Sequence, residues 1–101
     1  MATLYIAEYS DLAKAAPYLV QVPMEAPLTE QTVAIGGSSV QSAAFNTSTR
    51  LVRIHTNAIC SIKFGTNPTA SVTTARMAAG QTEYHGVPIG GTFKVAVITN
   101  T

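Results

Sequence analysis

The chain has 101 residues, a formal net charge of +1 and only 11% charged residues, against roughly 25% in typical soluble domains. This length fits one small domain, and the scattered basic residues exclude the clustered positive surface that nucleic-acid phosphates require. No segment approaches the roughly 20 apolar residues that span a bilayer, so neither nucleic acid nor membrane is an expected partner.

The first thirty residues are predicted to form an extended arm with little regular structure. A short strand fits residues 4–8, and a brief helical turn fits residues 12–15, which Pro17 would end. Further prolines favour extended conformations in the residues before them. We therefore expect an arm over residues 1–30 and a folded domain over residues 31–101.

After residue 30, short runs rich in β-branched residues alternate with Gly, Asn, Pro and Ser, which is typical of consecutive strands. Strands are expected at residues 32–35, 40–45, 50–56, 58–64, 81–87 and 93–97. No run has the period and length of a long helix. The fold predicted is all-β, a small antiparallel β-sandwich or jelly-roll-like barrel with an extended N-terminal arm.

Alternation of apolar and polar side chains defines the inward face of two neighbouring runs. The side chains assigned inward are Val52, Ile54, Cys60, Ile62 and Phe64. Their outward neighbours are Arg53, His55, Ser61 and Lys63. Because only a tight turn near Asn57 separates the two runs, we expect them to pair with each other as a hairpin.

Residue types that carry catalysis or bind metals are sparse. His85 and Glu83 would share one face of a strand, but a metal site needs further ligands beside them and His55. Asp11 is the sole aspartate, and the chain has no nucleophile motif with which it could form a Ser-His-Asp triad. Cys60 lies in an apolar run and is expected to be a buried thiol. The sequence therefore predicts no enzyme, no bound metal and no cofactor.

Several motifs of the predicted domain carry a resemblance to a known class of protein. They are Thr-Val-Ala-Ile-Gly-Gly-Ser at residues 32–38, Ala-Ile-Cys-Ser-Ile-Lys-Phe-Gly-Thr-Asn-Pro at 58–68, Gly-Val at 86–87 and Lys-Val-Ala-Val-Ile at 94–98. In these motifs the stretch from residue 31 to 101, about two thirds of the chain, resembles small proteins encoded among the head genes of tailed bacteriophages and prophages.

This resemblance implies a non-enzymatic virion structural protein that binds and stabilises the capsid surface, a decoration or cement protein. Its partners would be the major capsid protein and further copies of itself, as a trimer or dimer. It would be made in the cytoplasm of the host bacterium and end on the head surface of the virion. The residues expected to contact the capsid or other subunits are Tyr5, Tyr9, Tyr18, Met24, Asn67 and Pro68.

A second interpretation stays open, namely a carbohydrate- or receptor-binding β-sandwich module of a phage fibre or tail. Exposed tyrosines are suitable contacts for sugars, and the candidates are Tyr5, Tyr9, Tyr18 and Tyr84. Tryptophan is absent and aromatic residues make up only 7% of the chain, which is a low content for a surface that binds sugars on aromatic rings.

Overall fold

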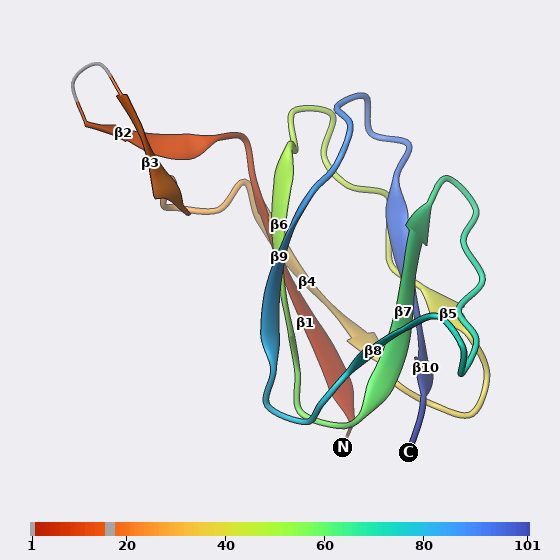
Figure 1. Ribbon diagram of the computed structural model, residues 1–101. Coiled ribbons are helices and arrows are strands. Elements are labelled where there is room, and N and C mark those ends of the chain that lie inside the picture. Colours follow the sequence, from red (N-terminus) through yellow and green to blue (C-terminus); the bar gives the residue numbers. More distant parts are fainter. Residues whose placement is uncertain (1, 16–17) are drawn as a thin grey trace.

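A computed structural model describes residues 2–15 and 18–101 of the chain. These residues form ten strands, arranged as two four-stranded antiparallel sheets and a separate two-stranded hairpin (Figure 1). The predicted all-β class and the small antiparallel sandwich are confirmed. Within the described residues, no helix is long and apolar enough to cross a membrane.

The first sheet is built around a strand from the N-terminus of the chain. Its order is β4 (Thr29–Ala34), β1 (Thr3–Tyr9), β6 (Leu51–Thr56) and β9 (Thr82–Gly86). β1 is antiparallel to both of its neighbours over almost its whole length. This central position satisfies the backbone hydrogen-bonding groups on both sides of β1.

The second sheet faces the first and contains the C-terminal strand. Its order is β5 (Val40–Gln41), β10 (Lys94–Thr99), β7 (Cys60–Gly65) and β8 (Ala75–Met77). From β4 to β10 the chain crosses from one sheet to the other at every connection except that between β7 and β8. This repeated crossing is the winding expected of a jelly-roll-like sandwich.

The crossing shows that the hairpin predicted for residues 50–56 and 58–64 is wrong. β6 pairs with β1 and β9, whereas β7 pairs with β10 and β8 in the opposite sheet. Both strands have one apolar face, and these faces pack against each other across the core instead of lying side by side. Alternation identifies the buried face of a strand but carries no information about which strand lies beside it.

The core lies between the inner faces of the two sheets. The inward assignments are confirmed, since Val52, Ile54 and Cys60 are fully buried and Phe64 packs on the core edge. Ser61 does point away from the core, but Asn100 Nδ2 donates a 2.7 Å hydrogen bond to its hydroxyl and covers it. The core side chains are Leu4, Ile6, Val33, Ile35, Phe45, Val52, Ile54, Cys60, Ile62, Met77, Val87, Val95 and Val97.

Residues 2–15 and 18–30 do not form the predicted arm with little regular structure. Leu4 and Ile6 of β1 are core residues, and the boundary expected after residue 30 falls inside β4, which pairs with β1. The helical turn predicted for residues 12–15 is also wrong, because these residues form β2 (Leu12–Ala15). Pro17, expected to end that turn, lies outside the described residues.

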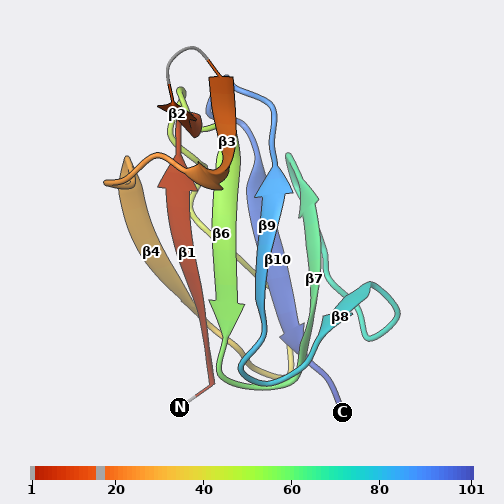
Figure 2. The same cartoon turned by 60° about the vertical axis from the view of Figure 1, so that its left-hand side comes forward.

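The part of the N-terminal region that does leave the sandwich is a hairpin. β2 pairs only with β3 (Tyr18–Pro23), and the two strands lie beyond one end of the sheets in both views (Figures 1 and 2). The two chain termini lie at the opposite end of the molecule. The molecule is consequently elongated, with extents of 46 × 26 × 21 Å.

Candidate functional site

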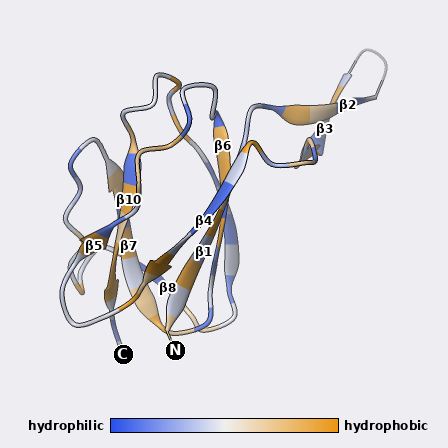
Figure 3. Ribbon diagram, turned by 180° about the vertical axis from the view of Figure 1, so that it is seen from behind, coloured by the Kyte–Doolittle hydropathy of each residue, from blue (hydrophilic) through white to orange (hydrophobic). Residues whose placement is uncertain are grey.

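The β2–β3 hairpin and the residue that follows it carry four exposed large apolar side chains. Tyr18 is 74% exposed, Leu19 55%, Val22 54% and Met24 45%. Figure 3 shows orange, hydrophobic segments on both strands of this hairpin, interrupted by blue, hydrophilic ones. A two-stranded hairpin has no second layer on which to bury such residues, so they are left facing solvent.

An apolar groove lies where the hairpin meets the first sheet. It has a volume of about 440 Å³ and is lined by Leu12, Gln21, Val22, Pro23, Leu51 and Tyr84. The first four belong to the hairpin, whereas the last two stand on the outer face of β6 and β9. We call the hairpin, together with the groove at its base, the hairpin surface.

The base of the hairpin is anchored by polar contacts. The backbone N–H of Met24 donates to the carbonyl of Asp11, at 3.1 Å. The hydroxyl of Tyr9 donates to the Glu25 carboxylate, also at 3.1 Å. Burial, together with this hydrogen bond to an anionic partner, raises the pKa of Tyr9 above its ordinary value. Tyr9 is 2% exposed, so it supports the hairpin surface from beneath and is not itself available for contact.

The other predicted contact residues lie elsewhere. Asn67 and Pro68 follow β7, where the Gln41 side-chain amide donates 2.8 Å hydrogen bonds to the Asn67 side chain and the Pro68 carbonyl. Asn67 is exposed, but Pro68 is buried against the second sheet. Of the six residues, Tyr18 lies at the far end of β3, Met24 follows β3 at the base of the hairpin, and Tyr9 is buried near that base, while Tyr5 lies further along β1.

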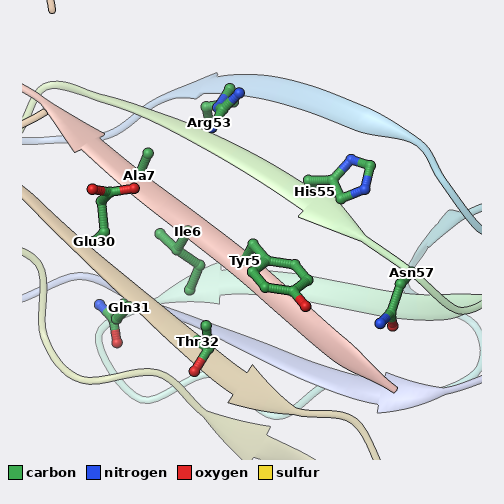
Figure 4. Close-up of a pocket in the computed structure, with 9 residues that line it drawn as sticks. All are labelled: Tyr5, Ile6, Ala7, Glu30, Gln31, Thr32, Arg53, His55 and Asn57. Carbon is green, nitrogen blue, oxygen red and sulfur yellow. The ribbon is translucent and has the colours of Figure 1, made fainter. Parts of the chain in front are cut away.

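Tyr5 stands beside an open hollow on the outer face of the first sheet, which sequence reasoning missed. The hollow has a volume of about 810 Å³ and is shown in Figure 4. The strand register places Thr32, Tyr5 and His55 in one row across the sheet and Glu30, Ala7 and Arg53 in the next. Because these residues come from three strands far apart in sequence, no local motif could have indicated the site.

A buried carboxylate, also missed, holds the loop that crosses between the sheets. Glu8 is 1% exposed, and its Oε1 accepts hydrogen bonds from the Asn46 backbone N–H at 2.7 Å and the Thr49 hydroxyl at 2.9 Å. Its Oε2 accepts a third from the Gln31 side chain, at 3.1 Å. With every oxygen satisfied, Glu8 is a structural clamp within the sandwich.

The residue types that might carry chemistry are dispersed. His85 Nε2 lies 2.9 Å from Glu83 Oε1, on the same face as predicted, and its ring lies against that of Phe64. Cys60 is fully buried, and burial raises the pKa of its thiol, which disfavours the reactive thiolate. No group of three His, Cys, Asp or Glu side chains that could hold a metal ion occurs within residues 2–15 and 18–101.

Comparison of the chain with models of protein families, with curated protein sequences and with solved structures finds no match. The resemblance to phage head proteins accordingly stays a prediction.

Proposed function

We propose that this protein is a non-enzymatic virion structural protein of a tailed bacteriophage, which binds the capsid surface and stabilises it. Its partners are the major capsid protein and other copies of this chain, in a trimer or dimer, with no role for nucleic acid or membrane. It is made in the host cytoplasm and occupies the head surface of the virion. The hairpin surface makes the principal contact.

The observation that supports this proposal most directly is the projecting apolar hairpin. Leu19 and Val22 are each more than half exposed on one short hairpin, and exposed apolar side chains gathered in one place are typical of interaction sites. The adjoining groove can accommodate a side chain that projects from a partner protein. A surface that combines a projection with a groove suits attachment to another protein.

The body of the protein is compatible with close packing among many copies. Only 11% of its residues are charged, so neighbouring copies experience little electrostatic repulsion. Strands β4 and β9 form the two edges of the first sheet and offer unpaired backbone groups that neighbouring subunits can cover. On a repetitive shell, modest contacts made by many copies add up to firm attachment.

The proposal is tested by co-sedimentation of the purified protein with empty heads of its parent phage. We expect saturable binding in numbers related to the capsid lattice and a higher melting temperature of the heads. Val22→Ser removes an apolar contact from the hairpin and should weaken binding at least about tenfold. Val72→Ser is the matched control, because Val72 is 61% exposed on the body of the sandwich and the substitution should leave binding unchanged.

Two outcomes would contradict the capsid role. One is the absence of binding together with equal melting temperatures of heads with and without the protein. The other is detection of the protein on purified tails or fibres instead of heads, which would support the alternative of a receptor-binding module. Equal binding by the Val22→Ser and Val72→Ser proteins would refute the contact through the hairpin surface.

A further inference from the structure

The hollow on the outer face of the first sheet has a regular layout. Glu30 and Arg53 flank Ala7 from the two neighbouring strands, and Figure 4 shows their side chains on either side of it. Ala7 is 3% exposed and forms a flat floor because its side chain is a single methyl group. Beside it, the ring of Tyr5 is 46% exposed and lies over β1.

The polar groups around this floor are not used by the fold. Among the described residues, the Glu30 carboxylate, the Arg53 guanidinium and the Tyr5 hydroxyl make no hydrogen bond or salt bridge. The two charged groups do not pair with each other, since β1 separates their strands. In contrast, His55 is held in place by a 2.8 Å hydrogen bond between its Nδ1 and the Thr82 hydroxyl.

The charges select the class of ligand. The negative charge of Glu30 and the positive charge of Arg53 cancel, so the hollow has no net preference for an anion or a cation. It offers a carboxylate that accepts hydrogen bonds, a guanidinium that donates them, and the hydroxyls of Tyr5 and Thr32, which do both. A matching ligand is neutral, rich in groups that both donate and accept, and has an apolar face to lie on the Tyr5 ring.

We propose that this hollow binds a neutral pyranose residue of a glycan. The hydroxyl groups of the sugar bridge Glu30 and Arg53 over the Ala7 floor, while its C–H face contacts the ring of Tyr5. A shallow, open site of this kind binds a single sugar in the millimolar range. Many copies on one particle would convert this into firm attachment to a glycan-covered surface.

The inference does not depend on the capsid role, because the hollow lies along β1, β4 and β6, whereas the groove of the hairpin surface is lined from β2, β3, β6 and β9. It is tested on the full chain by titrating the ¹⁵N-labelled protein with the methyl glycosides of glucose, galactose, mannose and N-acetylglucosamine. We expect saturable shifts for at least one sugar, confined to amides near residues 5–7, 30–32 and 53–55.

Variants of the exposed residues separate a sugar site from unspecific effects. Tyr5→Leu should weaken binding about fivefold to tenfold by removing the flat ring, and Arg53→Gln should do the same by removing the charged donor. The matched control Arg50→Gln changes an exposed residue outside both the hollow and the hairpin surface and should bind as the unmodified protein does. Thermal melting checks that each variant is folded.

Three results would overturn the proposal. The first is the absence of saturable shifts with all four glycosides. The second is a set of shifts centred on other residues, such as those of the hairpin. The third is unchanged binding by the folded Tyr5→Leu and Arg53→Gln proteins, which would show that sugar contacts the chain elsewhere.

Discussion

Glu8 is a carboxylate enclosed in the sandwich, and its partners determine what its removal does. Glu8→Ala leaves the Asn46 N–H and the Thr49 hydroxyl without their acceptor, and should lower the free energy of unfolding by about 2–4 kcal/mol. Glu8→Gln keeps the oxygen that serves both groups but loses the acceptor for Gln31, and should cost about 1–2 kcal/mol.

Urea denaturation measures the free energy of unfolding of the unmodified protein and of the two Glu8 variants. Glu30→Ala, an exposed glutamate on the neighbouring strand, is the control and should change the free energy of unfolding by less than about 0.5 kcal/mol. If Glu8→Ala were as stable as Glu30→Ala, the three hydrogen bonds would have no role in holding the crossing loop.

The raised pKa of Tyr9 makes stability depend on alkaline pH. Because the folded state holds this proton more tightly, the unfolded state ionises first as the pH rises past about 10. The contribution of Tyr9 is therefore complete below that pH and is lost as the pH rises through the folded-state pKa. As the pH rises above about 10, the melting temperature of the unmodified protein should fall more steeply than that of Tyr9→Phe.

The comparison with Tyr9→Phe separates Tyr9 from the other groups that titrate in this range. Cys60, whose pKa is also raised by burial, contributes equally to both proteins and cancels from the difference. Tyr18→Phe changes a tyrosine that is 74% exposed and should retain the steep fall. Parallel curves for the unmodified protein and Tyr9→Phe would contradict the assignment to Tyr9.

At the scale of elements, the β2–β3 hairpin is set apart from the sandwich. It pairs with neither four-stranded sheet, and isolated two-stranded hairpins are marginally stable. Lys14 on β2 is exposed, whereas Arg53 and Lys63 lie in strands that are paired on both sides. We expect trypsin to cut first after Lys14, because local opening of the hairpin requires less free energy than opening of the sheets.

Mass spectrometry of a short digestion time course identifies the first cut. Lys14→Gln should slow the appearance of the first fragments about tenfold, since the backbone at the remaining sites is hydrogen-bonded to the sandwich or paired within it, including that of Arg50 and that of Arg76 on the edge strand β8. Early cutting after Arg53 or Lys63 would instead show that the sheets open as readily as the hairpin.

At the scale of the whole molecule, the two proposed surfaces are neighbours on the outer face of the first sheet. The hairpin surface lies at the end opposite the chain termini, and the hollow lies on the flank of the first sheet (Figures 1 and 4). Tyr84, which lines the groove, is the strand partner of Arg53, which lines the hollow. The two sites therefore use different residues but are adjacent in space.

The sequence by itself determined most strands after residue 30, though not β8, and the core-facing side chains of β6 and β7. This worked because alternation is a local property, and Val52, Ile54 and Cys60 are buried whichever strands lie beside them. The same local reasoning identified the buried thiol. It also placed Tyr18 among the contact residues, and the structure leaves that side chain exposed.

Only the tertiary structure decided which strands pair and what their pairing assembles. β1 joins the sheet because it pairs with β4, and this pairing helps to bury Leu4 and Val33. The apolar surface buried in this way cannot be recognised from either segment alone. The separation of β6 from β7 and the grouping of Glu30, Ala7 and Arg53 arise in the same way. Strand pairing depends on the burial of two complete sheet faces, which is a property of the whole chain.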